Sequence, residues 1–273
     1  MKKIIFSEEK IKEIIYLYTV QNISMLQISK RFNVNDSIIK RILKENNIEI
    51  YDNNRYKSKS INENYFEKID NQNKAYILGY IYADGCLTKG NILSFSCCFD
   101  NLESLQIVKN ELQSDHKICK DINHSFYCPD AIYYKLSIAN QKIYNDLIQL
   151  GVKPRKTFSC SFPDISKVPE EFVRHFIRGY FDGNGSIFCY SKTNAPMIGF
   201  TSGSKNILEG IKIYLSNYIG TKAQIRSYND RKAFDYKIGG KKQIEKIYHY
   251  FYDDAFLFLG RKKEKFEKIL NIE

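Results

Sequence analysis

The fold is decided by a ten-residue stretch that the chain carries twice. The first copy is YILGYIYADG at residues 76–85, and the second is FIRGYFDGNG at residues 176–185, which begins 100 residues later. The copies carry the same pattern of apolar, glycine and acidic or amide positions, and each ends in an acid or amide followed by glycine. A repeat of this kind indicates a duplicated unit, and internal two-fold symmetry suits a partner such as duplex DNA. One difference bears on function, because Asp84 of the first copy is matched by Asn184.

The composition narrows the class of partner. The 273 residues include 42 Lys and Arg against 31 Asp and Glu, which gives a formal net charge of +11. This excess favours a polyanionic partner, although a basic surface can also be inert. The seven Cys show no C-x-x-C spacing and the four His are scattered, so we expect buried or free thiols in a reducing compartment and no zinc site.

The chain shows no sign of export or membrane insertion. No stretch approaches the ~18 consecutive apolar residues of a membrane span. The first ten residues, MKKIIFSEEK, turn acidic too early for a signal peptide. We therefore expect a cytoplasmic protein with no membrane partner.

The first fifty residues have the periodicity of three short helices. Ser7 precedes a helical pattern, and the tight turn at residues 33–35 separates two further amphipathic stretches, the last one capped by Asn35 or Asp36. This order resembles a resolvase-like helix-turn-helix, in which the start of the last helix enters the major groove. The expected DNA contacts are Asn35, Ser37, Lys40 and Arg41, although small helical bundles without DNA function share this periodicity.

The rest of the chain divides into a linker and two halves of the same order. Residues 51–64 are polar and aperiodic, as in a flexible tether. Each half then predicts a helix, a strand pair, a helix, a strand pair and a helix. The fold class is therefore α+β, an αββαββα unit present twice. The expected domains are residues 1–50 (helix-turn-helix), 51–64 (linker), 65–160 (first repeat) and 161–273 (second repeat).

With this order, both decapeptides resemble the signature of the LAGLIDADG homing endonucleases over residues 65–273. The resemblance implies that the two signature helices pack along a pseudo-dyad through the small residues Gly79, Ala83, Gly179 and Gly183. A glycine inside a helix costs roughly 1 kcal/mol relative to alanine, so glycines at matching positions suggest a packing purpose.

The resemblance also implies a metal site at the ends of these helices. The eighth signature position, counted from Ile77 and from Ile177, holds Asp84 and Asn184 here and projects into the active site; Gly85 and Gly183 are the neighbouring metal-ligand candidates. The implied cofactor is Mg²⁺, for which Ca²⁺ or Mn²⁺ could substitute. The alternative to a metal site is a purely structural D-G turn, which is common after a buried helix. Two copies in register favour the functional interpretation.

Asn184 departs from the family pattern, in which an acid is usual. A neutral amide offers an oxygen to a metal but no charge, so the affinity for a cation should fall. Three explanations are open: the chain was altered to trap an uncleaved complex, it naturally cleaves weakly or nicks one strand, or it binds DNA without cutting. We favour the first, because the rest of the pattern is intact.

The family also carries a basic residue near each scissile phosphate. Lys156, in the run GVKPRKTFS, and Lys262, in the run FLGRKKEKF, stand at the similar places here, although the second assignment could slip to Lys263. Both residues could equally belong to solvated lysine-rich turns.

Recognition in such a fold comes from antiparallel strands in the major groove, with alternate side chains directed at the bases. The candidate faces are residues 88–96, 133–137, 191–201 and 224–237. The candidate contacts on them are Lys135, Lys192, Gln224, Arg226, Arg231 and Lys237. A one-residue slip in register would invert every assignment.

The sequence thus predicts a monomeric, site-specific homing endonuclease that cuts double-stranded DNA at a long asymmetric target and is impaired at Asn184. A transcriptional regulator with a degenerate core, a strand-selective nickase and an RNA-binding maturase are the alternatives. A helix-turn-helix binds duplex DNA, and its presence therefore argues against the RNA-binding maturase.

Overall fold

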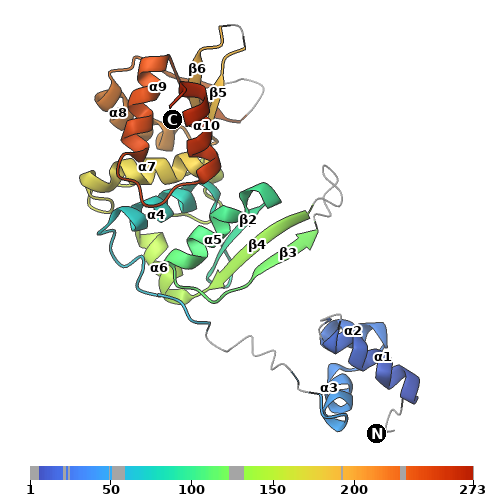
Figure 1. Cartoon of the computed structure of the whole chain (residues 1–273). Helices are drawn as coiled ribbons and strands as arrows, with labels where there is room; N and C mark the ends of the chain where they lie inside the picture. The colour runs from blue at the N-terminus through green and yellow to red at the C-terminus, as the bar shows by residue number, and fades with distance from the viewer. Residues whose placement is uncertain are drawn as a thin grey trace. The chain divides into compact units, whose positions relative to one another are not determined.

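A computed structural model describes residues 6–20, 23, 25–48, 50, 59–122, 132–191, 193–227 and 232–272. The chain forms two compact units, Met1–Ser58 and Lys59–Glu273 (Figure 1). Each unit has its own apolar core, and each is described separately below.

The N-terminal unit consists of α1 (Glu8–Thr19), α2 (Met25–Arg31) and α3 (Asp36–Glu45). Its core is built from Ile14, Ile28 and Ile39, which are 0% exposed, with other aliphatic side chains around them. Asn35 caps α3 by accepting a hydrogen bond from the Ser37 backbone N–H at 3.0 Å. Ser7 stands at the N-cap of α1, but its side chain makes no capping hydrogen bond. The three-helix arrangement is compatible with a helix-turn-helix.

The second unit has the predicted duplicated order. The first repeat comprises α4 (Gln72–Asp84), β1 (Cys86–Thr88), β2 (Ile92–Cys97), α5 (Leu102–Glu111), β3 (Ile118–Ile122), β4 (Ile132–Ala139) and α6 (Gln141–Gln149). The second comprises α7 (Glu170–Asn184), β5 (Gly185–Cys189), β6 (Pro196–Ser202), α8 (Lys205–Ile219), β7 (Ile225–Ser227), β8 (Phe234–Gly239) and α9 (Lys241–Tyr252). Short 3-10 turns lie at η1 (Phe99–Asn101) and η2 (Lys156–Phe158). The αββαββα prediction is confirmed for both repeats.

One helix, α10 (Gly260–Leu270), was not among the predicted elements. Its sequence, GRKKEKFEKIL, is dominated by charged residues, so the apolar periodicity that marks a helix is weak. The buried side of α10 consists of Lys262, Phe266 and Leu270, so a lysine takes one of the positions at which an apolar residue would be expected.

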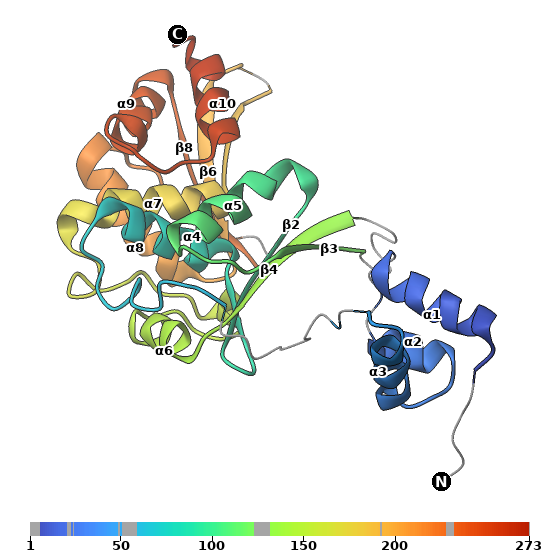
Figure 2. The ribbon, with the colours of Figure 1, turned by 60° about the horizontal axis from the view of Figure 1, so that its bottom comes forward.

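Each repeat contains a four-stranded antiparallel sheet, with strand orders β1-β2-β4-β3 and β5-β6-β8-β7. The registers correspond, because Phe95 pairs with Leu136 in the first sheet and Phe200 with Tyr236 in the second. All four of these side chains are buried under the helices that pack on one face of their sheet (Figure 2). The alternate side chains therefore lie on the opposite face of each sheet.

The helices α4 and α7 lie side by side at the centre of the second unit (Figures 1 and 2). A Cβ atom added to Gly79 would lie 2.0 Å from the carbonyl oxygen of Phe176, and one added to Gly179 would lie 2.0 Å from that of Tyr76. No side chain fits at such a distance, so only glycine permits the two backbones to approach this closely. The close contact joins the two repeats and brings the C-terminal ends of both helices together.

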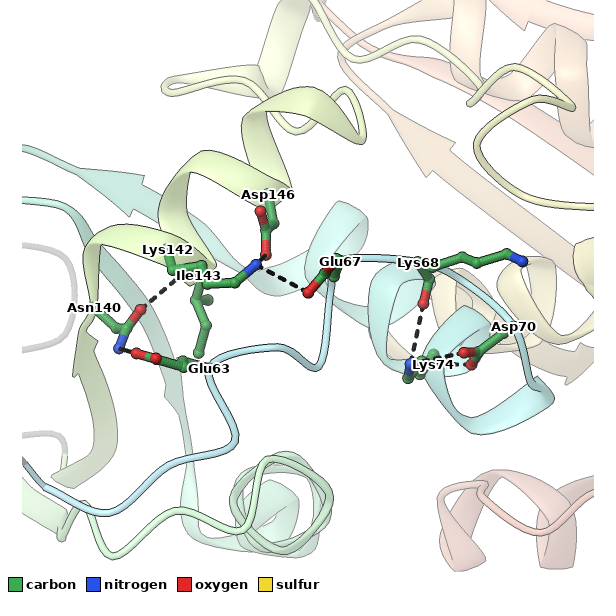
Figure 3. A network of polar contacts seen from close by, with 9 residues as sticks. All are labelled: Glu63, Glu67, Lys68, Asp70, Lys74, Asn140, Lys142, Ile143 and Asp146. Carbon is green, nitrogen blue, oxygen red and sulfur yellow. Dashed lines mark hydrogen bonds and ion pairs between the residues drawn. The ribbon is translucent and has the colours of Figure 1, made fainter.

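Polar contacts attach the segment that precedes α4 to α6 (Figure 3). The Lys142 Nζ lies 3.3 Å from a carboxylate oxygen of Glu67 and 3.0 Å from one of Asp146. The Asn140 side chain donates a hydrogen bond to Glu63 at 3.4 Å. Exposed pairs of this kind are worth about 0–1 kcal/mol each, so they orient the segment more than they stabilise the unit.

Candidate active site

The two signature helices end side by side, with Asp84 as the last residue of α4 and Asn184 as the last residue of α7. Both side chains are exposed, whereas the glycines that follow them, Gly85 and Gly185, are buried. A Cβ atom added to Gly183 would lie 3.3 Å from a carboxylate oxygen of Asp84, so the end of α7 is in contact with the acid of α4. The two predicted site positions therefore lie together.

Small residues make this contact possible. A Cβ atom on Gly183 would also lie 2.4 Å from the Cβ of Ala83, which is its counterpart in the first repeat. The four small residues assigned to the helix interface by the sequence thus lie at that interface: Gly79, Ala83, Gly179 and Gly183.

Asp84 is held in an environment with opposing electrostatic effects. Solvent reaches the carboxylate, but the surrounding protein removes part of its hydration, which raises its pKa. A side-chain hydrogen bond with Tyr80 and the positive charges of Lys156 and Lys262 act in the other direction. In the second repeat the Tyr180 side chain makes the equivalent hydrogen bond with Asn184. The tyrosine one turn earlier thus orients the tip residue in both repeats.

The two predicted lysines bind the helix ends in the same way. The Lys156 Nζ donates hydrogen bonds to the carbonyl oxygens of Gly85 at 2.6 Å and Ala83 at 3.3 Å. The Lys262 Nζ donates to the carbonyl oxygens of Gly185 and Phe181. The last carbonyls of a helix have no partners within it and carry the negative end of the dipole, so an ammonium group is stabilising there. Each lysine therefore stands at the end of the signature helix of its own repeat.

Burial makes both lysines easier to deprotonate. The pKa of Lys262 falls to about 8, first because burial penalises the charged form, while the negative charge of Asp182 acts against this fall. The pKa of Lys156 is also lowered by burial, with Asp84 acting in the other direction. The Nζ of Lys263 instead lies 3.6 Å from a carboxylate oxygen of Glu267 and above the ring of Phe258. Of the two neighbouring lysines, it is Lys262 that reaches the helix end.

A cavity of about 310 Å³ opens beside the tip of α7. Polar groups from both repeats line it, including Lys156 of the first repeat and Tyr180, Asn184 and Ser202 of the second. The space next to Asn184 is therefore shared between the repeats.

The donors at the tips suit a hard divalent cation. The candidates are the Asp84 carboxylate, the Asn184 amide oxygen and the backbone of Gly183, whereas the carbonyl of Gly85 already accepts a hydrogen bond from Lys156. Mg²⁺ in proteins commonly binds one or two carboxylates and completes its shell with water and substrate phosphate, so this set fits. Among the described residues, no group of three or more His, Cys, Asp or Glu side chains could hold a metal.

The candidate DNA contacts in the N-terminal unit lie on and before α3. Ser37 and Lys40 are exposed at the start of this helix. Asn35 is exposed as well, but its side-chain oxygen is used in capping. Arg41 is half-buried, with its Nε 3.7 Å from a carboxylate oxygen of Glu45.

In the second unit, three of the predicted contacts lie on the open faces of the sheets. Lys135 pairs with Ser96, and its neighbour Leu136 points into the core. Lys237 and Arg226 occupy the corresponding face of the second sheet. The Lys237 Nζ lies 2.9 Å from a carboxylate oxygen of Asp235.

Two boundaries of the predicted strand faces are wrong. Gln224 precedes β7, and its side chain accepts a hydrogen bond from Lys212 at 2.8 Å. Ser191 lies in the turn before β6. Polar residues at strand ends carry no signal that separates them from a turn, which explains both errors. Lys192 and Arg231 lie outside the described residues.

Comparison with known proteins finds one matching family model and several similar solved structures. Residues 171–251 match the family model of the LAGLIDADG-like domain. The meganuclease I-SmaMI bound to uncleaveable DNA with a TTCT central four is 12% identical, covers 72% of this chain and 88% of that chain, and gives a TM-score of 0.49. The I-LtrWI LAGLIDADG homing endonuclease bound to target DNA is 14% identical, covers 77% and 90%, and gives 0.47. The N-terminal LAGLIDADG domain of DUF199/WhiA is 16% identical, covers 79% and 90%, and gives 0.45.

A curated relative is found in an archaeon. The DNA-directed RNA polymerase subunit Rpo1C of Methanocaldococcus jannaschii is 25% identical over 209 residues, which correspond to 71% of this chain and 23% of that protein. The chain thus spans about a quarter of the length of the curated relative that it matches.

The second unit has a duplicated αββαββα architecture with paired helix ends, which is the fold that the resemblance of its two decapeptides to the LAGLIDADG signature predicts. The second repeat is a LAGLIDADG-like domain by its sequence, and the first repeat has the same order of elements and the same decapeptide pattern. No helix among the described residues is both long and apolar enough to cross a membrane.

Several polar residues at this site were not predicted. Tyr80 and Tyr180 contact the tip residues, and Arg178 and Asp182 are both 0% exposed in α7. The last two carry a signal in the sequence, because a charged residue within a helix that is otherwise buried on all sides must have buried partners.

Proposed function

We propose that this protein is a site-specific endonuclease of the homing type that hydrolyses phosphodiester bonds in double-stranded DNA with a divalent metal, and that Asn184 impairs it. One observation carries the proposal. The carboxylate of Asp84 and two lysines, one from each repeat, converge at the paired helix ends, from which the open faces of both sheets begin. The lysines also donate hydrogen bonds to the last carbonyls of the helices, but this capping does not require an exposed carboxylate between them.

In this proposal the Asp84 carboxylate would hold the metal, and Asn184 would contribute an uncharged oxygen from the other helix. A bound divalent ion would make an attached water more acidic and neutralise charge that develops on the phosphate. Lys156 and Lys262 offer N–H donors next to the tips, where they orient a water or a phosphate oxygen. The buried environment that lowers the pKa of both lysines makes proton transfer near neutral pH easier.

The proposed partner is double-stranded DNA with a long asymmetric site, bound by a monomer. Both halves of the site are present in one chain, so a second copy is not required. The two open sheet faces differ in sequence, and a separate three-helix unit adds a third surface. Unlike surfaces read unlike sequences, which supports an asymmetric target.

The test compares the protein with its Asn184→Asp and Asp84→Asn variants on a randomised duplex library with Mg²⁺, followed by mapping of cut ends. We expect weak or single-strand cutting by the present chain, cutting of both strands by Asn184→Asp, and none by Asp84→Asn or after addition of EDTA. Binding without cuts by both the protein and Asn184→Asp would refute the nuclease and favour a regulator.

A further inference from the structure

The sixth signature position, counted from Ile77 and Ile177, differs between the repeats, with Tyr82 in the first and Asp182 in the second. Both side chains are buried, at 3% and 0% exposure. Each makes a hydrogen bond to the segment that follows the last shared helix of its own repeat. The Tyr82 hydroxyl donates to the carbonyl of Leu150 at 2.8 Å, and Asp182 accepts from the backbone N–H of Leu259 at 2.8 Å.

In the first repeat, this segment is a turn that leads to Lys156. Leu150 is the C-cap residue of α6, and Gly151 follows it with φ +98°. A Cβ atom added to Gly151 would lie 2.6 Å from the Tyr82 hydroxyl oxygen, so the tyrosine packs directly on the turn. The chain then reaches η2, whose first residue is Lys156.

In the second repeat, the segment is the start of α10. Leu259 is the N-cap of this helix, and its carbonyl accepts a hydrogen bond from the backbone N–H of Lys262 at 2.9 Å. The peptide groups of Leu259 thus connect Asp182 on one side to Lys262 on the other. The Lys262 side chain returns to α7 by binding the carbonyl of Phe181 and lies 4.9 Å above the centre of its ring.

A second buried charge strengthens this attachment in the second repeat. Arg178, one turn before Asp182, donates to the carbonyl of Leu257 at 2.9 Å and to that of Phe251 at 2.7 Å. Asp182 also accepts a hydrogen bond from the Tyr76 hydroxyl at 2.7 Å. Buried charges are costly unless they are well paired, so their retention here points to a geometric requirement. The first repeat has the apolar Leu78 in place of Arg178.

We infer that Tyr82 and Asp182 are positioning residues, each of which fixes the segment that carries the lysine of its own repeat at the end of the signature helix. The inference rests on the proposed function for what the lysines do to a phosphate, but the positions of the lysines can be measured without DNA. It also explains why the sixth position is polar in both copies while its chemistry differs. A hydroxyl suits a carbonyl acceptor, and a carboxylate suits an N–H donor.

The experiment measures the reactivity of individual lysines toward acetic anhydride by mass spectrometry, with the full chain and without metal or DNA. Tyr82→Phe should raise the labelling rate of Lys156 by about fivefold, the factor that corresponds to a lost hydrogen bond of about 1 kcal/mol, and leave Lys262 unchanged. Asp182→Asn should raise the labelling of Lys262 and leave Lys156 unchanged. Tyr65→Phe is the control, because its buried hydroxyl binds Glu111 at 2.8 Å. It should change neither lysine.

The two variants differ in the risk of unfolding. Asp182→Asn removes one of the two carboxylates whose charges act on the buried Arg178. If that variant does not fold, Tyr82→Phe alone decides, because it removes a single oxygen. The inference would be overturned if Tyr82→Phe raised the labelling rates of Lys156 and Lys262 by the same factor, or changed neither rate. Changed labelling without any nuclease activity in the parent would leave the inference standing and count against the proposed function. Reduced cutting by Tyr82→Phe with unchanged labelling would refute the positioning role.

Discussion

The two repeats share a backbone but differ in their polar chemistry. Along α4 and α7 the pattern of buried and exposed positions is the same through the last two turns, and both helices end in an exposed tip residue followed by a buried glycine. Yet the tips are Asp84 and Asn184, and the sixth positions are Tyr82 and Asp182. Small and apolar positions therefore fix the symmetric scaffold, while a few polar positions make the two halves of the site unequal.

Substitutions at the contact between α4 and α7 should lower the unfolding free energy more than any other change, and by the same amount in both repeats. Gly79→Ala and Gly179→Ala each place a Cβ 2.0 Å from a backbone oxygen of the partner helix. Because neither backbone can move without disturbing the core, each variant should lose about 4 kcal/mol or more of unfolding free energy. Urea denaturation measures this loss.

The matched control is Gly260→Ala at the start of α10. The nearest atom to its added Cβ would be a flexible carboxylate oxygen of Glu103 at 3.5 Å, an ordinary contact. This variant should be neutral or slightly stabilising, since alanine is favoured over glycine within a helix. A mild effect of Gly179→Ala would contradict the close approach of the helices.

The glycine pairs also show how much the sequence could reveal. Two glycines at matching helical positions predicted the contact of α4 and α7, and the duplicated element order followed from periodicity and turn residues. The convergence of Lys156 and Lys262 on the helix tips was predicted from resemblance. Lys156 lies 156 − 84 = 72 positions after Asp84, and Lys262 lies 262 − 184 = 78 positions after Asn184, so no local pattern brings them together. Of the partners of Arg178 and Asp182, Leu257 and Leu259 lie in the segment before α10, whereas Phe251 lies in α9 and Tyr76 in α4. These contacts join residues that are far apart in the sequence, so no local periodicity predicts them.

Replacement of either lysine by methionine should increase the stability of the folded protein. Burial lowers the pKa of Lys262 to about 8, so the folded state disfavours its charge at neutral pH. Lys262→Met should add about 2 kcal/mol to the unfolding free energy at pH 7, after an allowance for the carbonyls left without a partner. Lys156→Met should add less, because Lys156 is half-buried. Denaturation with urea tests the order of the two effects.

The pH dependence gives the check. The folded-state pKa of Lys262 lies below that of the unfolded chain, so the penalty is complete below about pH 8 and disappears as pH rises toward 10.5. The advantage of Lys262→Met over the parent should shrink across that interval. A constant advantage would mean that packing, and not the charge, is responsible. Both variants should also cut DNA more slowly if the lysines act at the phosphate.

A buried histidine distinguishes the second repeat further. His175 stands where the first repeat has Ala75, and burial lowers its pKa to about 4. Since its folded-state pKa is depressed, the protein loses stability as pH falls from about 6.5 toward 4. After discounting for partial solvation, this loss should be about 1–2 kcal/mol.

The His175→Ala variant isolates this loss from the opposite trend of Asp182. Burial raises the pKa of Asp182 to about 6, which favours the folded state as pH falls through that range. The quantity to follow is therefore the difference in unfolding free energy between the parent and His175→Ala at pH 7 and pH 4.5. It should decrease toward the acidic side, and an unchanged difference would show that His175 titrates normally.

The smallest expected effect concerns the open faces of the two sheets. Lys135 is exposed in the first sheet, whereas Lys237 in the second lies 2.9 Å from Asp235 and is partly neutralised. If both faces meet DNA, Lys135→Ala should lower the slope of log K against log salt by about 0.9, the value for one phosphate, and Lys237→Ala by less. Asp235→Asn should instead increase the slope, because it leaves the charge of Lys237 available to a phosphate. Fluorescence anisotropy at several salt concentrations measures the slopes of all three variants. Equal slopes for Lys135→Ala and Lys237→Ala would show that the ion pair with Asp235 does not weaken the contact of Lys237 with a phosphate.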